Sequence, residues 1–316
     1  MRAAVIHELG ATPVVEERGE PVRGEGQALV ETGAAGMNPV DLAIGAGVFY
    51  GGHPPVPFVA GREGVGRVLE GDALAPGTLV ATLKTASGSM AERFVADEAE
   101  LWEIPADADP VTAAALGIAG LAGWLAVEER GRIQEGDRVL VLGATGTVGS
   151  VAVQAARLLG ASRVVAAGRD AGRLERSLRL GADATVHLDG GDLEQAFRAA
   201  FPDGGPELVI DPLWGPPALA AMAIAPIGMR FVNLGQSAGA SMELASAAVR
   251  GRLLEIIGHT VFEAPHEDLA RGHRAMLGHV AAGELEVGLE TFPLEQAAEA
   301  WEAQKSGPAH KLVVTV

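Results

Sequence analysis

A glycine-rich turn holds the residues of this chain whose types and spacing are best suited to chemistry. It follows the apolar segment 138–142 and reads Gly-Ala-Thr-Gly-Thr-Val-Gly. Gly146 lets the backbone approach a pyrophosphate, and Gly149 lets the following helix pack against the strand. The amino end of that helix offers N–H groups and a positive dipole end to phosphates. The pattern A-x-G-x-x-G therefore predicts a dinucleotide site with the turn residues Gly143, Ala144, Thr145, Gly146, Thr147, Val148 and Gly149.

The end of the next expected strand, 163–167, bears on the choice of cofactor. An NAD site usually has an acidic residue about 20 residues past the glycines, where it binds the ribose hydroxyls. This chain has Gly168 and Arg169 there, with Arg173 one helical turn later. Guanidinium groups suit a ribose 2′-phosphate, so these residues favour NADPH. Asp170 is the alternative, as the acidic residue of an NAD site, if the strand ends two residues later.

The remaining strand ends are candidates for the nicotinamide half of the cofactor. In open α/β sheets, ligands bind beyond the carboxyl ends of the strands. The candidate residues that follow the later strands are Leu213, Leu234, Gly235, Gln236, Gly258, His259 and Thr260.

The elements that must position these residues change character near Asp109-Pro110, where an N-cap and a first-turn proline predict a helix start. Before that point, short strands separated by Gly and Pro indicate a β-rich domain. From residue 138 onward, strands and apolar helices alternate, which predicts a doubly wound parallel sheet of six strands. The expected strands are 138–142, 163–167, 184–187, 207–211, 229–234 and 253–258, and the first helix is expected over 150–159. The terminal strand-like run 311–316 is expected to return to the first domain.

Composition excludes several classes of protein. The 316 residues are 48% hydrophobic and carry a net charge of −17, which argues for a globular protein that binds neither nucleic acid nor an anionic membrane. There is no cysteine, which excludes disulfides, thiolate catalysis and Cys-based zinc sites. The first residues turn polar too soon for a signal peptide, and no long apolar run predicts a membrane span. We expect a cytoplasmic protein.

Several motifs, taken in order, resemble those of the medium-chain dehydrogenase/reductase superfamily, and within it the zinc-free quinone oxidoreductase branch. The resemblance covers nearly the whole chain. It rests, besides the glycine turn, on N-P-V-D at 38–41, G-R-E-G-V-G at 61–66, G-D-R-V-L-V at 136–141, L-G-A at 159–161, L-G-A-D at 180–183 and F-P-L-E at 292–295.

The resemblance implies a fold, a domain division and a reaction. It implies an α/β protein with a GroES-like β-rich catalytic domain (1–113 and 263–316) and a Rossmann NADPH-binding domain (114–262). It implies transfer of a hydride from NADPH to a small-molecule substrate, either a quinone or an α,β-unsaturated carbonyl compound. Homodimers are frequent among such proteins, and the strand 253–258 is the natural edge for pairing two sheets.

The catalytic residues follow from the same resemblance. Zinc-dependent relatives have Cys near Asn38 and His at the position of Arg62, so this chain is expected to bind no metal. The resemblance places Asn38 and the region of Tyr50 at the nicotinamide. The Tyr50 hydroxyl is a possible proton donor, or else Tyr50 only lines the mouth of the site. Arg62 either stabilises a developing enolate or hydroquinone anion, or forms an ion pair with Glu63 or another acid. Glu63 is otherwise expected to bond the nearby backbone.

Two other functions stay open at this point. The motif G-Q-S-A-G at 235–239 matches a nucleophile elbow and would make Ser237 the nucleophile of a serine hydrolase, with downstream histidines as partners. A non-catalytic or sensing NADPH-binding protein is the other alternative. His266, His273 and His279 share one helical segment, but their spacings of seven and six predict solvated residues rather than a metal site.

Overall fold

The computed structural model describes all 316 residues, which form two compact units. Unit 1 comprises residues 1–119, 265–281 and 287–316, and unit 2 comprises residues 120–264 and 282–286. The first boundary lies a few residues after the expected 113/114, within helix α3 (Ile118–Leu125). The second lies close to the expected 262/263, but the short segment 282–286 returns to unit 2.

Unit 1 is built on a β-rich core, as the Gly- and Pro-punctuated sequence predicts. One sheet of seven strands has the order β15-β16-β3-β5-β6-β8, with β7 also paired to β3, and a second sheet has the order β2-β1-β4. The strands are β1 (Arg2–Ile6), β2 (Val14–Glu17), β3 (Gln27–Met37), β4 (Phe58–Val59), β5 (Gly64–Glu70), β6 (Leu79–Thr82), β7 (Arg93–Asp97), β8 (Trp102–Glu103), β15 (Leu289–Pro293) and β16 (Lys311–Thr315). The helices are α1 (Pro39–Gly45), α2 (Pro110–Ala115), α9 (His266–Ala281), α10 (Ala297–Lys305) and the 3₁₀ turns η1 (Glu98–Glu100) and η4 (Leu294–Gln296).

A local signal explains where helix α2 starts. Asp109 caps α2 by accepting hydrogen bonds from the backbone N–H groups of Val111 and Thr112, with Pro110 in the first turn, as predicted.

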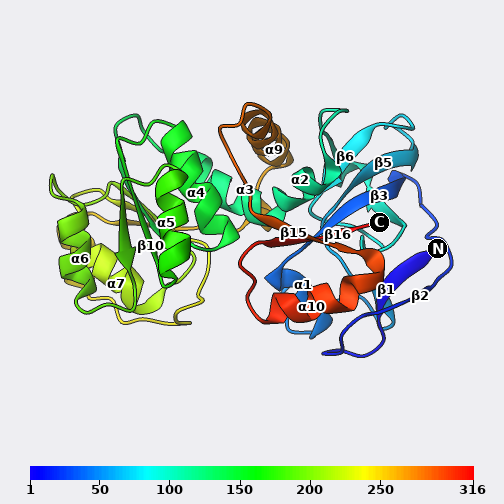
Figure 1. Cartoon of the computed structure of the whole chain (residues 1–316), viewed down its shortest axis with the longest axis horizontal. Coiled ribbons are helices and arrows are strands. Elements are labelled where there is room, and N and C mark those ends of the chain that lie inside the picture. The colour runs from blue at the N-terminus through cyan, green and yellow to red at the C-terminus, as the bar shows by residue number, and fades with distance from the viewer. The chain divides into compact units, whose positions relative to one another are not determined.

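The terminal strand β16 pairs antiparallel with β3 and parallel with β15. The two ends of the chain therefore contribute to the same sheet, as expected. Figure 1 shows β16 beside β3.

Unit 2 contains the predicted doubly wound sheet. Its six strands are all parallel and have the order β11-β10-β9-β12-β13-β14. The strands are β9 (Arg138–Leu142), β10 (Arg163–Gly168), β11 (Ala184–His187), β12 (Leu208–Asp211), β13 (Arg230–Asn233) and β14 (Glu255–Gly258). The helices are α4 (Thr147–Leu158), α5 (Ala171–Arg179), α6 (Leu193–Ala200), α7 (Gly215–Ala223), α8 (Ser246–Arg252), the 3₁₀ turn η3 (Val261–Glu263) and the π-helical turn η2 (Ala126–Arg130).

Helices cover both faces of this sheet, and its central strands β9 and β10 are apolar and buried after their first residue. Figure 1 shows α4 and α5 on one side of the strands and α6 and α7 on the other. Alternate strand residues such as Leu140, Val165 and Phe231 pack with Phe197 of α6 and Ala221 of α7. The predicted β-rich first unit and the predicted parallel sheet of six strands in the second are thus confirmed. Helix α4 begins at Thr147 rather than at 150, because Gly146 serves as its N-cap.

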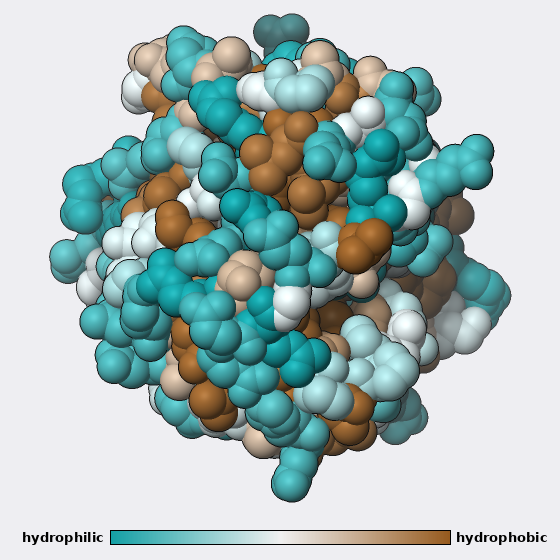
Figure 2. Space-filling model, turned by 90° about the vertical axis from the view of Figure 1, so that its right-hand side faces the viewer, coloured by the Kyte–Doolittle hydropathy of each residue, from teal (hydrophilic) through white to brown (hydrophobic).

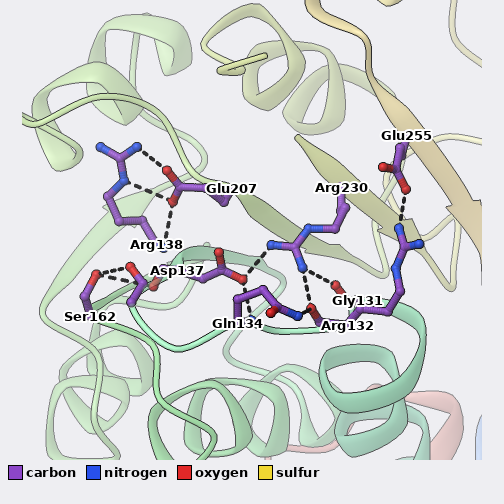
Figure 3. Close-up of polar contacts among 10 residues, drawn as sticks. Gly131, Arg132, Gln134, Asp137, Arg138, Ser162, Glu207, Arg230 and Glu255 are labelled. Atoms are coloured by element: carbon purple, nitrogen blue, oxygen red, sulfur yellow. Dashed lines mark hydrogen bonds and ion pairs between the residues drawn. The ribbon is translucent and has the colours of Figure 1, made fainter. Parts of the chain in front are cut away.

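The amino edge of the Rossmann sheet is held by charged side chains (Figure 3). Arg138, the first residue of β9, forms an ion pair with Glu207, which immediately precedes β12. Arg230, the first residue of β13, forms a nearly buried pair with Asp137, whose carboxylate also accepts a 2.8 Å bond from the Gln134 backbone. We call these residues, together with the pair Arg132–Glu255, the amino-edge network.

No helix is both long and apolar enough to cross a bilayer. The face of the molecule shown in Figure 2 is mainly hydrophilic, with small apolar patches separated from one another.

Candidate functional site

The glycine turn has the shape of a phosphate cradle. Gly143 has a φ of +62°, which lets the chain reverse directly after β9. A Cβ on Gly149 would lie 2.3 Å from the Gly143 carbonyl oxygen, so only glycine allows α4 to start this close to the turn. The backbone N–H of Ala144 donates to the Ala167 carbonyl oxygen (2.9 Å), which ties the turn to β10.

The amino terminus of α4 is left without a side-chain cap, unlike those of the next two helices, α5 and α6. Gly146 has no side chain to cap the helix, whereas Asp170 and Asp192 accept backbone N–H groups at the starts of α5 and α6. An uncapped helix start with N–H donors and a positive dipole end is suited to an anion. The arrangement therefore fits the pyrophosphate of a dinucleotide.

Arg169 directly follows β10, the strand that lies next to β9 and its glycine turn. The strand ends at Gly168, one residue later than expected, and a Cβ there would collide with the Thr145 side chain at 2.5 Å. Asp170 is occupied as the α5 cap, accepting the Arg173 backbone N–H at 2.9 Å and lying 3.7 Å from the Arg173 guanidinium. Arg169 follows the strand and is exposed. This geometry favours NADPH, with Arg169 at the 2′-phosphate, over NAD, with Asp170 at the ribose hydroxyls.

The predicted residues after β13 and β14 lie around one cavity of unit 2. The cavity has a volume of about 430 Å³ and is lined by Asn233, Leu234, Gly235, Gln236, Gly258, His259 and Thr260. Burial, and then the nearby Arg130, lower the pKa of His259 to about 4, so its imidazole is neutral at neutral pH. Leu213 lies apart from this cavity and packs against the glycine turn, 3.1 Å from the position of a Cβ on Gly143.

A buried polar cluster in unit 1 surrounds Asn38, and it contains a residue that the sequence did not suggest. The Lys311 ammonium donates to Glu63 Oε1 (2.7 Å), to the Met37 carbonyl oxygen (3.0 Å) and to Asn38 Oδ1. The Asn38 Nδ2 donates to Glu63 Oε1 at 2.7 Å, and Glu63 Oε2 accepts the Ile118 backbone N–H. Asn38 is 2% exposed, so both ends of its amide are used within the protein.

The structure decides between the alternatives for this cluster. Glu63 pairs with Lys311 rather than with its neighbour Arg62, and it bonds the backbone as expected, accepting the N–H of Ile118, 55 residues away in the chain. The ion pair forms because β16 brings Lys311 beside the end of β3. No local sequence signal marks this pairing, since 248 residues separate Glu63 from Lys311.

Arg62 and Asp41 line a second cavity, which lies within unit 1. Its volume is about 430 Å³, and it is lined also by the segments 51–54 and 85–88 and by Trp301. Asp41 accepts the backbone N–H groups of Asn38 (2.8 Å) and Arg62 (2.9 Å). Burial, and then the charge of Glu63, raise the pKa of Asp41 to about 6.

The Phe49 ring lies against the Arg62 guanidinium. Its central carbon lies 5.4 Å from the centre of the Phe49 ring, and the Phe49 and Tyr50 rings are 4.5 Å apart. Burial lowers the pKa of Arg62, while the charge of Asp41 opposes that shift. Tyr50 is 77% exposed. The structure thus groups Arg62 with the Tyr50 region, whereas Asn38 lies in the buried cluster.

The alternative sites have other roles in the structure. The Ser237 hydroxyl is exposed and donates to the Pro212 carbonyl oxygen at 3.2 Å, with no bond to a histidine. His273 is fully buried, contrary to the expectation of a solvated residue. It accepts a bond from Trp102 Nε1 (3.0 Å) and donates to the Ala113 carbonyl oxygen (2.9 Å). No group of three or more His, Cys, Asp and Glu side chains is placed to hold a metal ion.

Comparisons with known proteins place these features in a family. Residues 24–106 match the alcohol dehydrogenase GroES-like domain, and residues 147–272 match the zinc-binding dehydrogenase family. The chain is 30% identical to quinone oxidoreductase-like protein 2 of Bos taurus over 247 residues, covering 75% of this chain and 69% of that protein. It is 28% identical to the quinone oxidoreductase of Homo sapiens, covering 99% of this chain and 97% of that protein. The quinone oxidoreductase of Thermus thermophilus, solved also with NADPH, superposes with a TM-score of 0.83 at 26% identity over the whole of both chains.

Proposed function

Because the chain belongs to the medium-chain dehydrogenase/reductase superfamily, in its quinone oxidoreductase-like branch, we propose that it is a zinc-independent, NADPH-dependent oxidoreductase. Its substrate is a quinone or an α,β-unsaturated carbonyl compound. The observation that carries the proposal is the uncapped start of α4 at the glycine turn, with Arg169 at the end of the neighbouring strand.

Different residues of unit 2 bind different parts of the cofactor. The turn from Gly143 to Gly149 binds the pyrophosphate through backbone N–H groups. Arg169 and Arg173 bind the 2′-phosphate through charge-assisted hydrogen bonds. The cavity after β13 and β14 receives the nicotinamide half, beyond the carboxyl ends of the strands. NADPH bound in this way supplies the hydride.

The residues of unit 1 act on the acceptor. Arg62 stabilises the negative charge that develops on the acceptor oxygen, since a guanidinium in a partly buried pocket is little screened by water. The Tyr50 hydroxyl, or water beside it, delivers the proton. Asn38 contributes indirectly, because its amide holds Glu63 and Lys311 in place.

Zinc independence rests on the buried cluster of unit 1. An ammonium group already occupies the space between Glu63, Asn38 and the Met37 carbonyl oxygen. A cation in this position satisfies the Glu63 carboxylate without a metal ion. A metal analysis of the purified, active protein tests the point, and activity that depends on stoichiometric zinc would contradict it.

We also propose that two copies pair through β14. This strand forms one edge of the six-stranded sheet. Ile256 within it is 41% exposed, and Leu253, two residues before it, is 65% exposed. An edge strand with exposed apolar side chains favours sheet extension between copies. Light scattering on a size-exclusion column tests this, with Ile256→Lys expected to give monomers and a monomeric wild type contradicting the proposal.

Cofactor titration followed by NADPH fluorescence tests the cofactor and the role of Arg169 together. The wild type is expected to bind NADPH more tightly than NADH. Arg169→Ala should weaken NADPH binding about tenfold to 100-fold, the effect of losing a charge-assisted hydrogen bond, and leave NADH binding unchanged. The matched control is Arg179→Ala, which removes an exposed arginine at the far end of α5.

The titration leads to a turnover assay with 1,4-benzoquinone and a simple enone. Oxidation of NADPH that depends on either acceptor supports the reductase, and Tyr50→Phe and Arg62→Met should then lower kcat. Tight NADPH binding with no turnover on any acceptor would favour the sensing alternative. Failure of both nucleotides to bind would contradict the proposal.

A further inference from the structure

A buried carboxylate at the carboxyl end of β12 organises two of the loops at the proposed cofactor site. Asp211 is completely buried. Its Oδ1 accepts the backbone N–H groups of Leu213 and Trp214, both at 2.9 Å, and its Oδ2 accepts the side-chain Nδ2 of Asn233 at 3.0 Å. No cation pairs with it, so these N–H donors alone offset the burial of its charge.

The first of these loops, 212–215, has a conformation that it would not adopt unaided. Trp214 has φ +59° and ψ −168°, a region that is almost exclusive to glycine. The hydrogen bonds from the Trp214 backbone N–H to Asp211 hold Trp214 in this conformation. The centroids of the Trp214 indole and the Phe231 ring lie 6.2 Å apart, so the two rings pack edge to face. Strain of this kind persists only where the surroundings fix it, and it is concentrated at functional sites.

The second loop, 235–239, is locked to the first. The Asn233 Nδ2 also donates to the Gly235 carbonyl oxygen at 2.8 Å. The Ala238 backbone N–H donates to the Leu213 carbonyl oxygen at 2.8 Å. A Cβ on Gly235 would lie 2.5 Å from the Pro212 carbonyl oxygen, so only glycine permits this close packing.

The locked loops also reach the phosphate-binding turn. The Pro212 and Leu213 side chains lie 3.0 and 3.1 Å from the position that a Cβ on Gly143 would occupy. Loop 212–215 thus borders the turn on the side of β12, while the turn is held on its other side by the Ala144 backbone N–H, which donates to the Ala167 carbonyl oxygen of β10. The second loop begins at the cavity that Leu234, Gly235 and Gln236 line. Asp211 and Asn233 act on this cavity through the two loops.

The order of the strands decides which half of the dinucleotide these loops face. β9, which carries the phosphate turn, lies between β10 on one side and β12 on the other. Arg169, after β10, marks the side of the adenosine half. The loops after β12 and β13 lie on the opposite side, so they face the nicotinamide half.

We propose that Asp211, together with Asn233, is a positioning residue that fixes loops 212–215 and 235–239 and thereby selectively orders the nicotinamide half of bound NADPH. This inference rests on the proposed NADPH binding and extends it to a buried pair that acts through the two loops. The adenosine half, held by Gly168, Arg169 and Arg173, is independent of the Asp211–Asn233 pair.

Two ligands measured by titration calorimetry on the full chain separate the halves. NADPH spans both, whereas adenosine 2′,5′-bisphosphate occupies only the adenosine side. Asp211→Asn keeps the shape of the side chain but turns an amide N–H₂ towards the N–H₂ of Asn233. We expect it to weaken NADPH binding about tenfold, by analogy with the loss of one buried hydrogen bond, and to leave bisphosphate binding unchanged.

Two further variants distinguish positioning from general damage. Asn233→Asp in the Asp211→Asn background restores an acceptor for the new amide. It also places a carboxylate oxygen beside the Gly235 carbonyl oxygen, so it should recover only part of the NADPH affinity. Asp137→Asn alters a buried carboxylate of the amino-edge network and should lower stability without changing the ratio of the two affinities. If Asp211→Asn does not fold, Asn233→Ala gives the same measurement from the other partner.

The outcomes are decisive in each case. A selective loss of NADPH affinity with recovery in the double variant supports the proposal. Unchanged NADPH binding, or equal weakening of both ligands, would overturn it while leaving the cofactor assignment intact. A wild type that binds neither ligand would overturn the cofactor assignment and this inference together.

Discussion

The two edges of the Rossmann sheet use polar groups in opposite ways. At the amino edge, strands begin with charged residues such as Arg138, Arg230 and Glu255, whose side chains are satisfied by other side chains and by loop carbonyl groups (Figure 3). At the carboxyl edge, the chain turns at Gly143 and Gly168, and the first turn of α4 has no side-chain cap.

The difference separates stability from binding. A network whose donors and acceptors are all paired fixes the strand ends but has nothing left for a ligand. Backbone N–H groups at an uncapped helix start are available to an anion, and glycine permits its close approach. The predictions below change one edge at a time and follow stability and cofactor binding separately, beginning with the largest expected effect.

Breaking the buried ion pair of the amino edge should cost the most stability. Arg230→Met leaves the Asp137 carboxylate, which is 8% exposed, without its cation. Loss of one partner of a buried pair costs about 3–5 kcal/mol. We expect urea unfolding to show this decrease, while NADPH affinity of the folded protein stays at the wild-type value. A loss of affinity as large as the loss of stability would contradict the division between the edges.

Adding a side chain to the glycine turn should affect NADPH binding, the quantity that the Arg230 variant leaves unchanged. Gly149→Ala places a Cβ 2.3 Å from the Gly143 carbonyl oxygen and pushes α4 away from the turn. NADPH affinity is expected to fall about 100-fold, equivalent to about 2.7 kcal/mol. Gly251→Ala, in α8 with no atom near the added Cβ, is the matched control and should bind NADPH normally. Normal binding by Gly149→Ala would remove the turn from the site.

The carboxyl edge should also respond to mild acid, because it contains a buried histidine. The folded-state pKa of His259 is lowered to about 4, below the ordinary value of 6.5. As the pH falls below 6.5, His259 binds a proton in the unfolded chain but stays neutral in the folded protein. The free energy of unfolding therefore decreases until the pH reaches about 4. For a largely buried group this amounts to about 2 kcal/mol between pH 7 and 5.

Denaturant unfolding of the wild type and His259→Gln at the two pH values measures this contribution. The variant should lose about 2 kcal/mol less than the wild type on acidification. The buried His273 of unit 1, whose pKa is also lowered to about 4, continues to contribute in both proteins. Identical pH dependence in the two proteins would exclude the assignment to His259.

The smallest effect is expected at the exposed end of the amino-edge network. Arg132 and Glu255 pair with about half of each side chain exposed. Such pairs contribute about 0–1 kcal/mol, so Glu255→Gln should change the unfolding midpoint little and NADPH affinity not at all. A loss of several kcal/mol would mean that the network acts as one cooperative unit, including its solvent-exposed pair.

Prediction from sequence succeeded where neighbouring residues carry the signal. The turn after β9 and the cap of α2 are encoded within a few residues, since strand, glycines, proline and capping aspartate adjoin one another. Arg169 could be placed because it directly follows a short apolar strand. Element ends were less accurate: α4 starts three residues before the expected 150, at a glycine cap that no apolar periodicity marks.

Prediction failed where partners are distant in the chain. His273 was expected in solvent, but it is buried because Trp102, 171 residues earlier, supplies its hydrogen bond. Asp211 was recognised only as a strand end, because its partner Asn233 belongs to the next strand of the sheet.

By itself, then, the sequence determined the family, the two kinds of sheet and the position of the phosphate turn, since these depend on local pattern and on the order of motifs. Only the tertiary structure decided that Lys311 neutralises Glu63, that Asn38 is enclosed between them, and that Asp211 fixes the loops after β12 and β13. The physical reason is that a buried charge must find its partners in space. Strand pairing brings those partners together from segments as far apart as β5 and β16, and no spacing along the chain records it.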